Sequence, residues 1–234
     1  MIDPMEVLMG KLLEQPRGEF VPTGETRESF LGSLKQTPAE KMLGSQKGLS
    51  KSERIEQNRQ ETIREIKSLN LTPELESTMY AAIEYESGGT FDVNKKEIMS
   101  PDEDRDPGIG AFQKTGKTLS SYRGYLQGKN QPTTLRNELT YYTDAFRNPN
   151  SKVGKFLGSG YMNDYKNFLE GKPSEFRVHK GSGTKKVYKP TLEDINEHFT
   201  NFMMNPREDA RKASLPIRLN LAKEAYKNIF GPKK

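Results

Sequence analysis

The feature that most limits the fold of this chain is a succession of apolar stripes at helical spacing, which begins at residue 72. The clearest stripe contains Leu135, Leu139, Tyr142 and Phe146, at positions i, i+4, i+7 and i+11. Because an α-helix has about 3.6 residues per turn, these side chains share one face and are expected to be buried. The sequence therefore predicts a mainly helical domain. Stripes of the same kind are Tyr161, Tyr165, Phe168 and Leu169; Leu192, Ile195, Phe199, Phe202 and Met203; and Leu219, Ala222, Tyr226 and Ile229.

Two short segments alternate in the way that β-strands do. They are "TFDVNKKEIMS", residues 90–100, and "FRVHKGSGTKKVYKP", residues 176–190. The second is typical of a hairpin, with "KGSGTK" as its turn. We expect a small β element within the helical domain.

The first part of the chain has a different composition. Residues 3–12 form a short amphipathic helix in this interpretation, and a segment rich in Gly, Pro, Ser and Lys follows it. Such a segment cannot bury enough apolar surface to fold by itself. We therefore predict that residues 1–51 form an extended arm that docks onto a larger assembly, and that residues 52–234 form the domain. The domain should begin with a charged helix capped by Ser52.

Composition excludes several classes of function. The chain has no Cys and only two His, which are far apart, so a metal site or a Ser/His triad is not expected. No cofactor motif is present. The start of the sequence does not show the basic region and unbroken apolar run of a signal peptide, so none is expected, and no stretch reaches the roughly 20 apolar residues that cross a bilayer. The net charge of +5 suits an anionic partner.

The segment "AAIEYESGGTFD", residues 81–92, holds the best candidate for a catalytic group. A helix that starts at Thr72-Pro73 and ends at Gly88-Gly89 places Glu86 at the end of its apolar face, whereas Glu84 points to solvent. Burial and the negative end of the helix both favour a protonated carboxyl, as a general acid requires. The alternative is that Glu86 is a buried acid held by an arginine, such as Arg123 or Arg136.

A second group of candidates lies in residues 99–118. Asp102, Glu103, Asp104 and Asp106 crowd together just before a Gly-Ile-Gly turn. Beside that turn, Gln113 and Thr115 are neutral hydrogen-bonding residues suited to sugar hydroxyl or acetamido groups. The alternative is a solvated acidic loop, since the twelve-residue calcium-loop pattern is missing.

Together the two segments resemble the lysozyme superfamily. Glu-Ser-Gly-Gly at residues 86–89, followed by Gly-Ile-Gly-Ala-Phe-Gln at residues 108–113, is similar to the pattern of lytic transglycosylases and bacteriophage tail lysozymes. Weaker likeness continues in "TTLRNELTYYTDAF", "EHFTNFMMNPRED" and "RLNLAKEAYKNIF", so that it covers residues 72–230. The resemblance implies an α+β lysozyme-like fold.

The resemblance also implies a function and a set of site residues. The function is a virion-associated enzyme that cleaves the β-1,4 glycan bond of peptidoglycan during genome entry. Glu86 would be the general acid, and Asp106 or Asp104 the second carboxylate. The predicted substrate-binding residues are Ser87, Gly110, Phe112, Gln113, Thr115 and Tyr142. For Tyr142 and its neighbour Tyr141, a place in the core is an equally good interpretation.

Two other functions fit the sequence. One is a structural virion protein whose lysozyme-like domain is inactive or only binds glycan, with the N-terminal arm contacting other tail proteins. The other is a nucleic-acid-binding module, suggested by the basic segment 172–190. No RNA- or DNA-binding motif supports the latter, so nucleic acid is the less expected partner.

Overall fold

Helices make up most of the chain that the structure describes. The computed structural model describes residues 48–92, 110–114, 116–172, 175–180, 183–204 and 208–232. The predicted arm helix, most of the strand at 90–100, and Asp102, Glu103, Asp104 and Asp106 lie outside these ranges. The chain divides into two units, residues 1–49 and 50–234. The second unit is mainly helical with a two-stranded sheet, as predicted.

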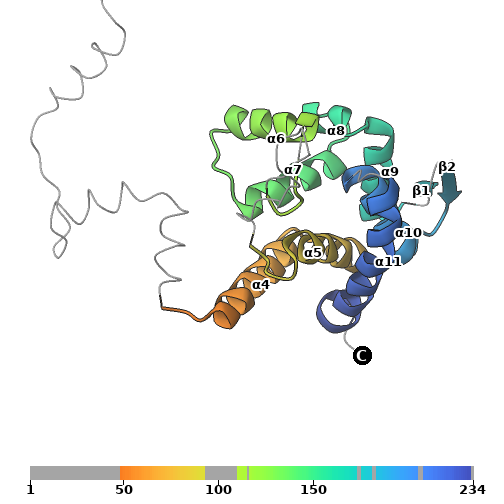
Figure 1. Ribbon diagram of the computed structural model, residues 1–234. Coiled ribbons are helices and arrows are strands. Elements are labelled where there is room, and N and C mark those ends of the chain that lie inside the picture. Colours follow the sequence, from red (N-terminus) through yellow and green to blue (C-terminus); the bar gives the residue numbers. More distant parts are fainter. Residues whose placement is uncertain are drawn as a thin grey trace, which may run out of the picture. The chain divides into compact units, whose positions relative to one another are not determined.

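Figure 1 shows the helices and strands of the second unit. The helices are α4 (Lys51–Ser68), α5 (Pro73–Ser87), α6 (Gly116–Gly128), α7 (Leu135–Arg147), α8 (Lys152–Phe156), α9 (Ser159–Leu169), α10 (Leu192–His198) and α11 (Glu208–Ala225). The π-helical turns η1 (Phe199–Met204) and η2 (Tyr226–Phe230) continue α10 and α11, and β1 (Phe176–Lys180) and β2 (Gly183–Val187) form the sheet.

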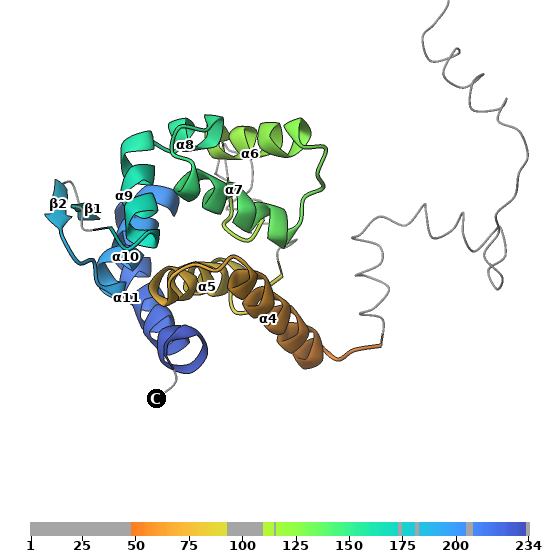
Figure 2. The same ribbon diagram turned by 180° about the vertical axis from the view of Figure 1, so that it is seen from behind.

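Helix α5 is the centre of one layer, in which it packs against α4, α10 and α11 (Figure 2). Its ends are those that the sequence predicted. Thr72 caps the start, Pro73 opens the first turn, and Gly88 ends the helix in the left-handed conformation at φ 62°. The predicted apolar face is buried, and so are most of the other residues of the helix.

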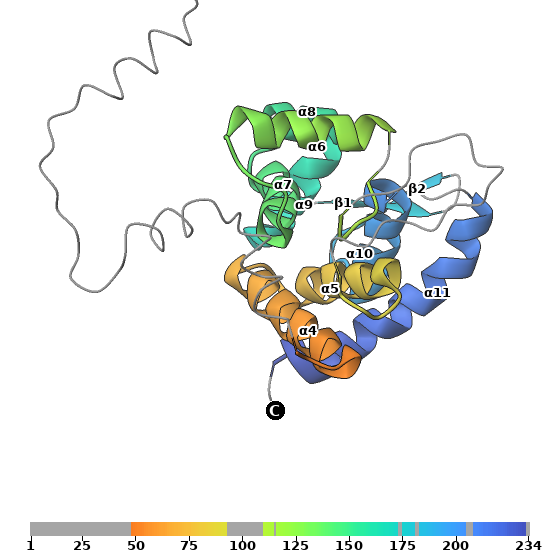
Figure 3. The ribbon, with the colours of Figure 1, turned by 60° about the vertical axis from the view of Figure 1, so that its left-hand side comes forward.

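Helix α7 crosses the second layer, with α6 and α8 on its far side from α5 (Figure 3). The four residues of its predicted stripe are all buried, so that prediction is confirmed. Rings from this face continue the core, since Phe146 stacks on Tyr165 of α9 at a centroid distance of 4.4 Å.

The predicted hairpin is present, but its strands extend into the predicted turn "KGSGTK", because Lys180 belongs to β1 and Gly183, Thr184 and Lys185 belong to β2. Strands β1 and β2 pair antiparallel, with Phe176 opposite Val187 and Lys180 opposite Gly183. The hairpin is anchored to α9 by Arg177, whose Nε donates to Asp164 Oδ2 at 2.6 Å. Phe176 packs edge-on against Tyr165, which buries this end of the sheet.

Two predictions about helices were wrong or incomplete. The cap of α4 is Ser50, not Ser52. The Ser50 hydroxyl accepts from the Glu53 backbone N–H, and the Glu53 carboxylate accepts from the Ser50 N–H at 2.8 Å, which completes a capping box. Helix α6 was not predicted, because it contains three glycines and its buried residues form no long stripe.

One buried carboxyl on α5 makes the stability of the fold depend on pH. Glu76 lies in the first turn and is only 8% exposed. Its Oε1 accepts from the Leu71 backbone N–H at 3.3 Å. Burial is the main cause that raises the pKa of Glu76 to about 7, and the Leu71 hydrogen bond opposes it.

We predict that Glu76→Gln flattens part of the pH profile of stability. The folded state binds the Glu76 proton more tightly than the unfolded state, so this group's contribution is largest below its ordinary pKa of 4.5 and falls as the pH rises to about 7. The glutamine keeps the acceptor for Leu71 and removes the charge. Urea unfolding at pH 4.5 to 8 should show the variant gaining up to about 3 kcal/mol relative to wild type across that window. An unchanged slope would contradict the assignment.

Candidate functional site

Glu86 lies on the last turn of α5, where it forms an ion pair with Arg218 of α11. Arg218 Nη2 donates to Glu86 Oε1. The side chain of Arg218 is only 2% exposed, whereas that of Glu86 is 20% exposed. The guanidinium also lies over the ring of Tyr85, 4.3 Å from its centroid. The carboxylate is therefore held from the buried side and remains accessible from the other.

The sequence left open whether an arginine holds Glu86, and one does. The partner is not one of the two arginines suggested. Arg136 donates instead to Glu65 Oε2 at 2.7 Å, and Arg123 lies exposed on α6. Arg218 has two further nitrogens, Nε and Nη1, that are buried without a hydrogen-bond partner within the described ranges. The contact with Glu86 is therefore the main polar interaction of this side chain. The two unpaired N–H groups cost free energy, because they are buried.

Glu84 is not fully solvated, contrary to prediction. It is half-buried, and burial raises its pKa, with the charge of Arg59 on α4 acting in the opposite direction. Arg59 Nε donates to the hydroxyl of Tyr80 at 2.9 Å. The charges that act on Glu84 are therefore those of Arg59 on α4 and Glu224 on α11, and not that of Arg218. Glu84 offers a control for Glu86 from the same helix turn.

The turn at residues 110–114 is fixed by a buried carboxylate that the sequence did not single out. Glu138 of α7 accepts from the backbone N–H groups of Ala111 at 3.0 Å and Phe112 at 2.9 Å, and it forms an ion pair with Lys114. The side chains of Glu138 and Lys114 are both 1% exposed. Burial lowers the pKa of Lys114, and the charge of Glu138 opposes that shift.

The glycine of the turn is required by this arrangement. Gly110 has φ +85°, and a Cβ built on it would lie 2.4 Å from Glu138 Oε2. The close approach of backbone to carboxylate explains why glycine precedes Ala-Phe-Gln here. It gives Gly110 a structural role in shaping the turn.

Contacts between rings connect this turn to Tyr142 of α7 and Phe199 of η1. Phe112 packs edge-on against Tyr142 at 5.0 Å and lies 5.9 Å from Phe199. The pKa of Tyr142 is raised, first by burial and then by nearby negative charges that include both Glu138 and Glu86. Glu138, which fixes the turn, and Glu86, at the end of α5, therefore both act electrostatically on Tyr142.

The other predicted site residues have mixed positions. Ser87 is buried, and its hydroxyl accepts from the Phe91 backbone N–H at 2.9 Å, which closes the turn after α5. Phe112 and Tyr142 are both buried, so the core interpretation of Tyr142 and Tyr141 holds. Gln113 is half-buried, and its amide donates to the Gly110 carbonyl at 3.1 Å. Thr115, Asp104 and Asp106 lie outside the described residues.

Two further classes of site are not seen in the described part of the chain. Its His, Asp and Glu side chains include no group of three or more that could hold a metal ion. None of its helices is both long enough and apolar enough to cross a membrane.

We predict strong coupling between Glu138 and Lys114. Glu138→Gln keeps an oxygen for the turn but leaves the Lys114 ammonium buried without a counter-charge, which should cost about 3–5 kcal/mol of unfolding free energy. Adding Lys114→Met removes the unpaired charge, so the double variant should be more stable than Glu138→Gln alone. Urea unfolding of the wild type, both single variants and the double variant measures this coupling. Additive effects of the two substitutions would contradict it.

Comparison with known proteins adds no further constraint on this site. No protein-family model, curated protein or solved structure matches the chain. The chemistry of Glu86, Arg218 and the Gly110–Lys114 turn is therefore the basis on which a function is proposed.

Proposed function

We propose that this protein is a peptidoglycan glycosidase of the lysozyme or lytic transglycosylase type, carried in a bacteriophage particle, with Glu86 as its general acid. One observation carries the proposal. A partly exposed carboxylate ends a buried helix and is fixed by a buried arginine, and it acts electrostatically on the same tyrosine, Tyr142, as Glu138, which clamps the backbone of residues 111 and 112. The particle, its tail proteins and the docking role of residues 1–51 come from the sequence resemblance and composition.

Glu86 and Arg218 have separate roles in the proposed reaction. A general acid must carry a proton that it can transfer. Glycan covers the exposed side of Glu86, and the protonated Glu86 side chain lies at the glycosidic bond. It then donates this proton to the glycosidic oxygen as the bond breaks. Arg218 stabilises the carboxylate that remains.

The fate of the sugar depends on a second carboxylate, for which Asp106 and Asp104 remain the candidates. A carboxylate about 6.5–9.5 Å from Glu86 would activate water and invert the sugar, whereas one about 5 Å away would attack as a nucleophile. Without either, the 6-hydroxyl of the substrate would close an anhydro-sugar. The three chemistries release different products.

A second candidate function is a non-catalytic virion component that assembles through this domain or binds glycan. The Glu86–Arg218 pair favours it, because the pair also joins α5 to α11 and would stabilise the fold without any reaction. In this case wild-type protein binds peptidoglycan but releases no soluble fragments.

We predict that Glu86→Gln lowers the rate of peptidoglycan solubilisation at least about 100-fold, because the amide cannot donate the proton. Glu84→Gln, two residues away on the same helix, is the matched control and should keep wild-type activity. Loss of turbidity of purified peptidoglycan gives the rate, and the melting temperatures of both variants report whether they remain folded.

Mass analysis of the released fragments would separate anhydro-sugar ends from reducing ends. Full activity in Glu86→Gln, or loss confined to Glu84→Gln, would overturn the assignment of the acid. A wild-type protein that binds peptidoglycan and releases nothing would establish the second candidate instead.

A further inference from the structure

A groove of about 970 Å³ lies between α6 and α8, and Glu86, Arg218 and the residues 110–114 are not among those that line it. Its volume falls within the range of ligand sites, about 300–1,000 Å³. The two helices that form it lie side by side in Figures 1 and 3. The lining residues are Gly116, Lys117, Leu119, Ser120, Ser121, Arg123, Gly124, Tyr125, Gly128, Lys129, Lys152, Val153 and Phe156.

The groove is strongly basic. Four of its lining residues are cations and none is acidic. The segment from residue 116 to residue 156 contains seven Lys or Arg residues and two acidic residues, a formal charge of +5. The whole chain also has a net charge of +5, so the residues outside this segment have no net charge. Such a concentration attracts an anionic ligand.

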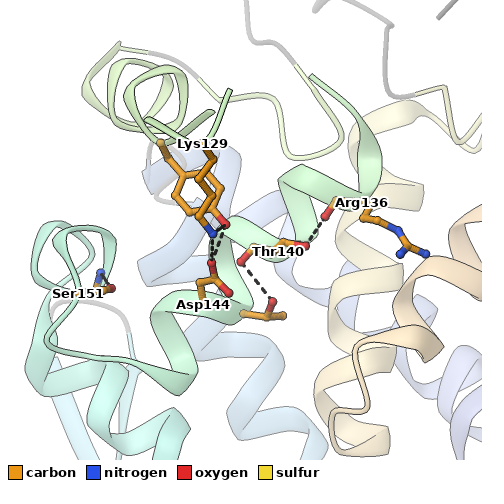
Figure 4. Close-up of polar contacts among 8 residues, drawn as sticks. Lys129, Arg136, Thr140, Asp144 and Ser151 are labelled. Atoms are coloured by element: carbon orange, nitrogen blue, oxygen red, sulfur yellow. Dashed lines mark hydrogen bonds and ion pairs between the residues drawn. The ribbon is translucent and has the colours of Figure 1, made fainter. Parts of the chain in front are cut away.

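Three of the four cations are available to a ligand. Lys117, Arg123 and Lys152 are exposed, and no ion pair involves them in the part of the chain that the structure describes. Lys129 differs, since its Nζ donates to Asp144 Oδ2 at 2.7 Å and to the Tyr125 hydroxyl at 2.8 Å (Figure 4).

Glycines leave one wall of the groove bare. Gly124 and Gly128 lie on successive turns of α6, and a Cβ added to either would meet no atom within 4 Å. The apolar part of the lining comes from Leu119, Val153 and Phe156, the last of which is 44% exposed. A ligand in this groove therefore meets helix backbone and small apolar surfaces between the cations.

The aromatic rings argue against single-stranded nucleic acid as the ligand. Such ligands stack successive bases on open rings. The Tyr125 ring already has Lys129 Nζ 4.3 Å from its centroid and Tyr141 edge-on at 5.4 Å. Phe156 is the one other aromatic residue in the lining. Charge and small apolar contacts, which an acidic peptide with short side chains would satisfy, fit the groove better.

We propose that this groove binds the carboxylate-bearing peptide stems of the bacterial cell wall, at a site separate from Glu86. Stem peptides combine free carboxylates with alanine methyl groups, which matches the cations and the bare apolar wall. The choice of the wall as the source of the peptide rests on the proposed function. Binding in the groove would hold peptide-substituted wall close to the domain, whether or not cleavage follows.

Calorimetry with soluble disaccharide–peptide fragments of peptidoglycan tests this proposal. The Glu86→Gln protein is used, so that no fragment is consumed. We expect binding that weakens about tenfold or more when the fragment carboxylates are amidated, and that is lost with peptide-free glycan oligomers. Equal affinity for free and amidated fragments would overturn the proposal, and so would preferential binding of oligothymidylate.

Variants of the groove locate the binding. Gly124→Glu, made in the Glu86→Gln protein, places a side chain and a negative charge in the open space, and it favours the helix by replacing glycine. The melting temperatures of Gly124→Glu and of its Glu86→Gln parent report whether both remain folded. Lys152→Glu should weaken binding about tenfold, whereas Lys155→Glu, on the same helix but outside the lining, should not. Equal effects of the two lysine substitutions, or full binding by Gly124→Glu, would overturn the assignment.

The proposed function and this inference fail separately. In one outcome, the wild-type protein cleaves nothing, while fragments bind in a way that Gly124→Glu abolishes. This result would contradict the proposed glycosidase activity and support the proposed binding site in the groove. Cleavage of peptidoglycan by the wild-type protein, without any fragment binding to the Glu86→Gln protein, would support the proposed activity and contradict the proposed binding site.

Discussion

The pair between Glu86 and Arg218 is the interaction on which the arrangement of the site depends. It joins the C-terminal end of α5 to α11, across 132 residues of sequence. A buried guanidinium needs a counter-charge, and the nearly buried position of Arg218 makes Glu86 that partner. The same contact also fixes the position of Glu86, whose side chain is still 20% exposed. The structural and the catalytic interpretation of Glu86 therefore rest on the same contact. Only a measurement of peptidoglycan cleavage distinguishes them.

Much of the secondary structure could be predicted from the sequence because its signals are local. Helix α5 is marked by Thr72 and Pro73 at its start and by Gly88 at its end, and the stripe of α7 repeats over three turns. The sequence did not predict the cap of α4 or the helix α6, because local signals there are ambiguous. Ser50 and Ser52 are both acceptable caps, and only Ser50 has glutamate three residues later, at Glu53. Helix α6 has glycines where helices usually avoid them, and two of these, Gly124 and Gly128, line the groove.

The candidate site could be predicted in part. Helical spacing was sufficient to identify Glu86 as the carboxylate at the end of a buried face, but it could not identify Arg218, because the partner is brought close by tertiary packing alone. Glu138 was missed for a related reason. It lies in the α7 sequence beside the apolar stripe, where an acidic residue usually indicates an exposed position, yet it is buried by its bonds to the backbone of residues 111 and 112. The sequence did contain one signal for Glu138. The turn at residues 110–114 has a glycine and ends in Lys114, which indicates that a buried acidic residue could pack against it.

Helix α7 connects the candidate site with the basic groove. Glu138, near its start, clamps the turn that ends at Lys114, and α6 begins only two residues later, at Gly116. Asp144, six residues further along α7, holds Lys129 and Tyr125 near the other end of α6. Both ends of α6 are thus fixed to the same helix by carboxylates, one buried and one half-buried. Because the Glu138 contact also positions Phe112 against Tyr142, a change that loosens it would disturb the surroundings of Glu86 and the wall of the groove together. The two surfaces are therefore expected to be coupled through α7, although they share no residue.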